Sequence, residues 1–204
     1  MTTFTLQARA GQINASAYAM DVCCVLTNAL FPLEFEMICK SAKNNYQLSS
    51  LFDDALIAKA MSTEMPIGSL QLPKDIAKEY DAVLKTKFGL VVIEVEKANW
   101  EKFLYDLMKA HIYLNHGAEY CCIILPENWA HQHGEINVFQ ESSKRLDLAR
   151  KYKCGDPRVL DRVFLIGFRQ FWKDTLLSQS GREQMRNECR KQFNEAEQAF
   201  VSDR

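Results

Sequence analysis

Hydrophobic positions in the first third of the chain recur mostly at helical spacing. Apolar residues fall on one face of residues 14–30, and the same period returns over residues 50–61, which predicts two helices. Pro32 interrupts the first of them, and we read residues 33–44 as a further helical stretch. An irregular segment with prolines and a glycine follows. We therefore expect residues 1–75 to form a mainly helical, structural part.

The middle of the chain combines two patterns. Runs rich in Val and Ile predict strands at residues 80–85 and 90–96, joined by a turn at 86–89. Helical spacing then predicts a helix from Asn99 to His116. Further expected elements are strands at 120–125 and 162–168 and a helix at 182–200. Strands that alternate with helices predict an α/β fold, with a central mixed β-sheet flanked by α-helices.

The length of 204 residues fits a single domain with a sizeable core. Within it we expect the helical part of residues 1–75, a catalytic sheet core over 76–170, and a C-terminal helical part over 171–204. The formal net charge of -1 gives no overall positive field, which disfavours a protein that simply coats DNA. A nuclease remains compatible, because it can concentrate its Lys and Arg in one cleft.

The lack of certain sequence features indicates where in the cell the protein is located. No apolar run approaches the ~20 residues of a membrane span, and the first residues do not resemble a secretory signal, so we expect no membrane association. The seven cysteines are odd in number and show no C-x-x-C spacing, which supports neither a disulfide framework nor a zinc site. We expect a cytoplasmic protein with mostly buried thiols.

Two carboxylates interrupt the apolar strand in the centre of the chain. Glu94 and Glu96 are two residues apart, so their side chains leave the same face, while Val95 points the other way. A hairpin centred between residues 87 and 88 places Asp81 opposite Glu94, at roughly 5 Å between Cβ atoms. The pattern predicts that three carboxylates gather on one face of the sheet.

Three gathered carboxylates repel one another and raise each other's pKa values. A divalent cation would remove this penalty, and oxygen ligands without histidine or thiolate favour Mg²⁺, with Mn²⁺ as a substitute. Such an ion can activate a bound water for phosphodiester hydrolysis. The alternative is an exposed edge strand with solvated acids. The apolar residues 90–93 and the registered Asp81 favour the site.

At these residues the sequence resembles the PD-(D/E)xK nuclease superfamily, which places an acid on one strand and an acid-x-Lys on the next. Within it, the stretch from Phe88 through Trp129 is similar to type II restriction endonucleases of the BglII type, which cut sites with a GATC core. The resemblance includes Val92-Ile93-Glu94-Val95, Tyr105-Asp106-Leu107 with His111, and Ile123-Ile124-Leu125-Pro126.

The resemblance implies that Asp81 and Glu94 are metal ligands and that Glu96 completes the site. Glu96 stands where the superfamily usually has lysine, and Lys97 comes one position later, on the opposite face; the restriction branch also accepts Glu or Gln there. Glu64, with Asp53 and Asp54 behind it, is a candidate for an additional upstream acid, although ordinary surface charge is the simpler interpretation.

Other polar residues have a functional and a structural interpretation. Lys85, Lys97, Lys102 and Lys109 could hold phosphates or be solvated. We expect Asp106 to lie within the helix, His111 to be a core histidine, and His131 and His133 to be exposed in a loop. Arg182, Arg186 and Arg190 form a basic stripe that could follow DNA phosphates or pair with Glu183 and Glu188. Residues 141–158 are the most basic stretch, where we expect loops that contact DNA.

These features lead to three hypotheses. The first is a Mg²⁺-dependent endonuclease that cuts double-stranded DNA as a homodimer, with restriction of foreign DNA implied by the resemblance. The second is a repair or structure-directed nuclease on the same core. The third is a non-catalytic binding or assembly protein that retains the fold.

Overall fold

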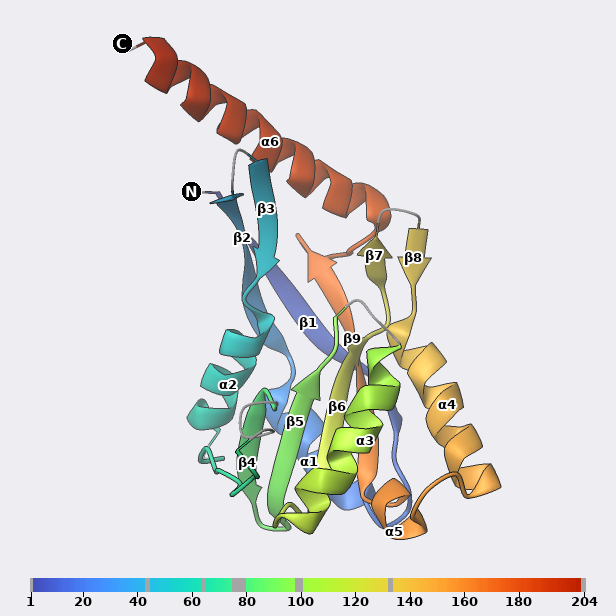
Figure 1. Cartoon of the computed structure of the whole chain (residues 1–204). Coiled ribbons are helices and arrows are strands. Elements are labelled where there is room, and N and C mark those ends of the chain that lie inside the picture. The colour runs from blue at the N-terminus through green and yellow to red at the C-terminus, as the bar shows by residue number, and fades with distance from the viewer. Residues whose placement is uncertain are drawn as a thin grey trace.

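The computed structural model describes residues 2–42, 45–63, 65–74, 80–97, 101–131 and 134–202. Its main β-sheet has the strand order β3-β2-β1-β9-β6-β5-β4, with the short β10 paired to β9 (Figure 1). The strands of this sheet are β1 (Thr3–Asn14), β2 (Leu33–Ala42), β3 (Asn45–Ser50), β4 (Ala82–Thr86), β5 (Gly89–Val95), β6 (Tyr120–Pro126), β9 (Val163–Trp172) and β10 (Thr175–Leu176). A separate hairpin consists of β7 (Trp129–His131) and β8 (Gly134–Ile136).

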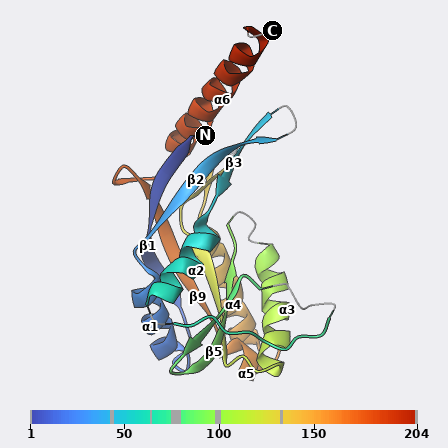
Figure 2. The same ribbon diagram turned by 90° about the vertical axis from the view of Figure 1, so that its left-hand side faces the viewer.

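Helices cover both faces of this sheet. Its core is divided into two clusters because alternate residues of each strand point to opposite faces. One face packs on α1 and α2 and the other on α3 and α4, as the two views show (Figures 1 and 2). The helices are α1 (Met20–Leu30), α2 (Phe52–Ser62), α3 (Lys102–Asn115), α4 (Val138–Tyr152), α5 (Pro157–Leu160) and α6 (Gln179–Ser202).

β9 joins the two halves of the sheet. It pairs antiparallel with β1 and parallel with β6, so the strands β1–β3 and the strands β4–β6 meet only through it. Glu127 secures this join, because its carboxylate accepts a hydrogen bond from the Gln12 N–H and is paired with Arg169 at 2.8 Å. Gly11 and Gly167 lie against the Glu127 side chain, where a Cβ atom would collide with it.

The central part of the sequence prediction is confirmed. The α/β class with a mixed sheet is observed, and the hairpin has the expected register, with Ala82 opposite Ile93 and Thr86 opposite Gly89. The expected strands over 120–125 and 162–168 correspond to β6 and β9, and the expected helix over 182–200 lies within α6. No helix within the described ranges combines the length and apolar character that a bilayer crossing requires.

The prediction of a mainly helical part over residues 1–75 is wrong. Residues 33–44 contain the strand β2, residues 3–14 form β1, and residues 45–50 form β3. In β2 the buried Leu33, Phe35 and Met37 alternate with the exposed Glu34 and Glu36, which is the period of a half-buried strand. The helices expected at 14–30 and 50–61 are present in shortened or shifted form as α1 and α2.

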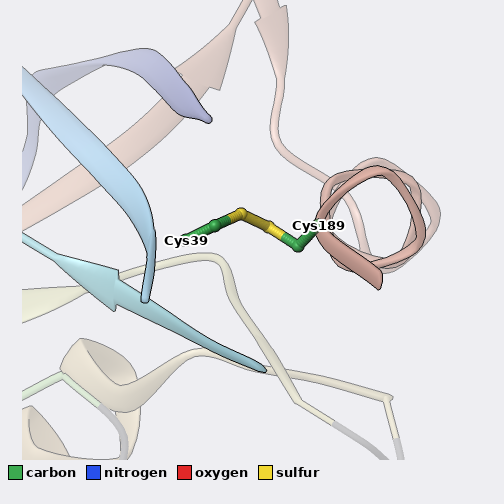
Figure 3. Close-up of a disulfide and its surroundings, with 2 residues drawn as sticks. All are labelled: Cys39 and Cys189. Carbon is green, nitrogen blue, oxygen red and sulfur yellow. A yellow bond between two sulfur atoms is a disulfide. The ribbon is translucent and has the colours of Figure 1, made fainter. Parts of the chain in front are cut away.

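One disulfide links distant parts of the chain, contrary to the expectation from cysteine spacing. Cys39 on β2 bonds to Cys189 on α6, across 150 residues of sequence, and holds the helix beside the strand (Figure 3). Cysteine spacing does not reveal a pair this far apart. The free thiols of Cys23, Cys121 and Cys122 are buried as expected, whereas the other free cysteines, Cys24 and Cys154, are exposed.

We predict that removal of this bond loosens α6. Because a disulfide restricts the unfolded chain, the Cys39→Ala/Cys189→Ala double variant should lose about 2–4 kcal/mol of unfolding free energy in urea. A reductant should lower the stability of the wild type but not that of the double variant. Cys154→Ala, at an exposed free cysteine, is the control and should behave as wild type. Seven reactive thiols in the unreduced, denatured protein would show that the bond does not form.

Candidate functional site

A buried carboxylate lies near the carboxyl end of β5. Glu94 is 4% exposed, and its Oε1 accepts hydrogen bonds from Lys109 Nζ at 2.8 Å and from Tyr113 OH at 2.7 Å. Burial raises the pKa of Glu94 to about 7, although both bonds act to lower it. The side chain of Glu94 is therefore fixed between the sheet and α3.

Two further acids lie beside Glu94. Glu96 is half-buried, two residues along β5, and Asp106 is buried on α3. Burial, and then the charge of Asp106, raise the pKa of Glu96 to about 7, while Lys102 at 3.5 Å opposes this effect. Asp106 Oδ2 is buried and has no hydrogen-bond partner among the described residues. The chain thus buries more acidic oxygens here than its own donors satisfy.

Lys109 is the cation that these acids share. Its ammonium group is 2.8 Å from Glu94 Oε1 and 3.0 Å from Asp106 Oδ1. Burial would lower the pKa of Lys109, but the interactions with Glu94 and Asp106 outweigh it and raise the pKa above its ordinary value. Lys109 therefore stays charged and compensates part of the negative charge of the site.

Asp81 lies at the start of the hairpin, next to the first residue of β4. Its Oδ2 accepts a hydrogen bond of 2.7 Å from the Val95 N–H, which points toward β4 beyond the last paired residue of that strand. Burial of the carboxylate raises the pKa of Asp81, and the charges of Asp53 (raising), Lys97 and Lys109 (both lowering) also act on it. Asp81 thus completes the hydrogen bonding at the end of the hairpin.

The structure brings the sequence-predicted acids to the same end of the hairpin, without a closed set of ligands. Glu94 and Glu96 both face α3, whereas Asp81 precedes the paired residues of the hairpin and bonds to the Val95 N–H. In the part of the chain that the structure describes, no three His, Cys, Asp or Glu side chains are arranged as metal ligands. Lys97 lies on the opposite face, paired with Asp53 at 2.5 Å.

Other sequence predictions concern residues further from this cluster. Glu64 and His133 lie outside the described residues, as does the side chain of His131. Residues 141–158 are mostly helix and not the expected loops, and several of their cations have partners within the chain. Arg145 pairs with Glu141, and Arg150 donates to Asn14 Oδ1 at 2.5 Å.

Sequence reasoning missed Asp106, Lys109 and Tyr113 as members of the site. It also predicted His111 to be a core histidine, and this is wrong. His111 is exposed, and so are Leu104 (52%) and Met108 (70%). The helix turns a mixed face inward instead, because Glu94 needs hydrogen-bond donors. The i, i+3, i+7 spacing of residues 106, 109 and 113 was the available signal.

Comparisons with known proteins bear on the fold. No protein-family model matches the chain, and no curated protein matches its sequence. The crystal structure of restriction endonuclease BglII complexed with a DNA 16-mer is similar to it, with a TM-score of 0.51 and 11% identity, over 82% of this chain and 76% of that chain. Free BglII aligns with a TM-score of 0.42 and 11% identity, over 82% and 79%. The DNA-bound structure shows that this chain has a restriction-endonuclease-like fold.

The raised pKa of Glu96 predicts how the stability of the metal-free protein depends on pH. An unfolded glutamate titrates near its ordinary value of 4.5 and folded Glu96 at about 7, so the folded state binds more protons between these pH values. The contribution of Glu96 to stability therefore falls as pH rises from 4.5 to 7. Glu96→Gln removes this loss, which we put at about 2 kcal/mol.

The measurement compares melting temperatures at pH 5 and pH 8 in the presence of EDTA. The decrease in Tm from pH 5 to pH 8 should be roughly 4–8 °C smaller in Glu96→Gln than in the wild type. Glu183→Gln, at an exposed residue of α6, should keep the wild-type decrease. Equal decreases in Glu96→Gln and wild type would mean that the carboxyl of Glu96 is not desolvated.

Proposed function

We propose that this chain is a metal-dependent endonuclease that hydrolyses phosphodiester bonds in double-stranded DNA, in the manner of a type II restriction enzyme. The observation that carries the proposal is the pair of carboxyls, Glu94 and Glu96, with pKa values of about 7 at the end of β5. They lie on a restriction-endonuclease-like fold. We also propose a cytoplasmic location.

The donor set suits a hard divalent cation. Asp81 and Glu94 are the proposed ligands of Mg²⁺, or of Mn²⁺ as a substitute, and Glu96 completes the site. The bonds from Lys109 and Tyr113 both go to Oε1 of Glu94, and the bond from the Val95 N–H uses only Oδ2 of Asp81. The unpartnered, buried Asp106 Oδ2 also fits a nearby cation. Such an ion would supply charge stabilisation and would make a bound water more acidic.

The protein groups can carry out the proton transfer. With a pKa of about 7, Glu96 is substantially ionised at neutral pH and able to accept the proton of an attacking water. Lys109 remains an ammonium ion and can stabilise negative charge that develops on the phosphate. Glu94 is held in place by Tyr113. This arrangement favours direct attack by water without a covalent intermediate.

Two other functions share parts of this proposal. A repair or structure-directed nuclease would use the same carboxyls, and a binding or assembly protein would retain the fold without cutting. Incubation with a panel of plasmids separates them. Discrete fragments indicate restriction, trimmed ends or cut flaps indicate a structure-directed nuclease, and intact DNA with no Mg²⁺ binding indicates a non-catalytic protein.

We predict that Glu94→Gln and Asp81→Asn each reduce Mg²⁺-dependent cleavage of plasmid DNA by at least ~100-fold. Both substitutions keep an oxygen that can accept the existing hydrogen bonds but remove the charge that a metal ion needs. The variants should therefore remain folded, with an unchanged or higher Tm at pH 8 in EDTA. Asp174→Asn, at an exposed acid paired with Arg9, serves as the control. Normal cutting by Glu94→Gln would refute the site.

One site per chain cuts one strand, so cleavage of both strands of a palindrome requires a two-fold dimer. We propose that a second copy of this chain covers the exposed apolar residues Leu104, Tyr105 and Met108 of α3. Light scattering should then give the mass of a dimer for the wild type and of a monomer for Met108→Glu. A monomeric wild type would contradict the dimer but not the catalytic site.

A further inference from the structure

A second feature of the molecule is a cavity of about 720 Å³ beside α6, outside the acidic cluster formed by Glu94, Glu96 and Asp106. Its size falls within the ~300–1,000 Å³ usual for ligand pockets. Four cations line it together with an indole ring, and no acidic residue is among its described lining residues. The cations are Arg182, Arg186, Arg190 and Lys97, of which Lys97 is paired with Asp53, and the indole is that of Trp129.

Arg182 is the most unusual of these residues. It is 4% exposed, its Nη2 donates to Gln170 Oε1 at 3.0 Å, and its guanidinium lies 4.0 Å from the centre of the Trp129 ring. Its buried Nε has no hydrogen-bond partner in the described ranges. Burial and the neighbouring Arg186 lower the pKa of Arg182 to about 10. A buried guanidinium without a carboxylate partner is costly unless an anion binds there.

The basic residues of α6 are arranged differently from those of α4, the other basic helix. On α4, Lys144 and Arg145 are paired with Glu141, and Arg150 donates to Asn14 on β1. By contrast, neither Arg182 nor Arg186 forms an ion pair with any described residue, so the pairing with Glu183 and Glu188 considered above is not observed for them. Trp129 holds the Arg182 guanidinium in place through a cation–π contact. The cavity is therefore organised to bind an anion.

The position of the cavity relates it to the acidic cluster. Lys97 lines the cavity and directly follows Glu96 in sequence, at the carboxyl end of β5. α6 lies beyond the end of the sheet toward which β5 runs (Figure 1). A polyanion whose cleaved phosphate lay at Glu94 and Glu96 could extend from there into the cavity.

We propose that this cavity binds the sugar–phosphate backbone of the DNA strand that flanks the cleaved phosphodiester. The inference rests on the proposed nuclease function and adds a binding site to it. Arg182 and Arg186 donate to phosphate oxygens, and the planar guanidinium suits this role because it presents several N–H groups in fixed directions. Contacts of this kind set affinity and register and carry no direct sequence information.

The test measures DNA binding by fluorescence anisotropy, with a labelled duplex of mixed sequence and no divalent cation, over a series of NaCl concentrations. Arg186→Gln should weaken binding roughly tenfold. It should also reduce the slope of log K against log salt concentration by about 1. Lys191→Gln removes the same charge from α6 at an exposed residue that does not line the cavity, and should leave affinity and slope unchanged. Arg182→Gln should act like Arg186→Gln if it folds.

The outcomes separate this inference from the proposed function. Wild-type affinity and slope in Arg186→Gln, with a wild type that cuts DNA, would overturn the cavity site alone. Weakened binding in Arg186→Gln, with a wild type that never cuts DNA, would support the cavity and overturn the nuclease. A wild type that binds no DNA would overturn both.

Discussion

The ammonium group of Lys109 is the interaction on which the arrangement of the acidic cluster depends. Glu94 and Asp106 are buried between β5 and α3, where isolated carboxylates would be too costly to ionise. Lys109 bonds to both, and Tyr113 donates a further hydrogen bond to Glu94. Because these buried carboxylates need hydrogen-bond donors, α3 buries polar side chains and exposes Leu104 and Met108.

The sequence was informative where a local pattern decides the structure. The hairpin register followed from a short turn, and the face shared by Glu94 and Glu96 followed from strand alternation. It failed where the outcome depends on distant partners. At β2 the alternation of residues 33–37 was a strand signal that was misread as a helix, whereas the inward face of α3 is set by Glu94 on another element. The bond between Cys39 and Cys189 likewise leaves no trace in cysteine spacing.

Net charge alone conceals how the basic residues are distributed. The chain has 25 Lys and Arg against 26 Asp and Glu, which describes a nearly neutral protein. Yet the basic residues of α4 are partly neutralised by nearby groups, whereas Arg182 and Arg186 on α6 line a cavity without acids among its described residues. The disulfide at Cys189 lies on the same helix and anchors it to β2. The arginines that line the cavity are thus carried by one helix, which the disulfide fixes to β2.

The place of β9 in the sheet has a consequence for synthesis of the protein on the ribosome. β1 leaves the ribosome first, but its neighbour β9 begins only at Val163. Until then the nascent chain holds two separate half-sheets, each with an unpaired edge where β9 will insert. Pairing over such a long sequence separation is slow, and exposed edges invite aggregation. We infer that the sheet closes only once β9 has been made, and that the growing chain is most vulnerable just before then.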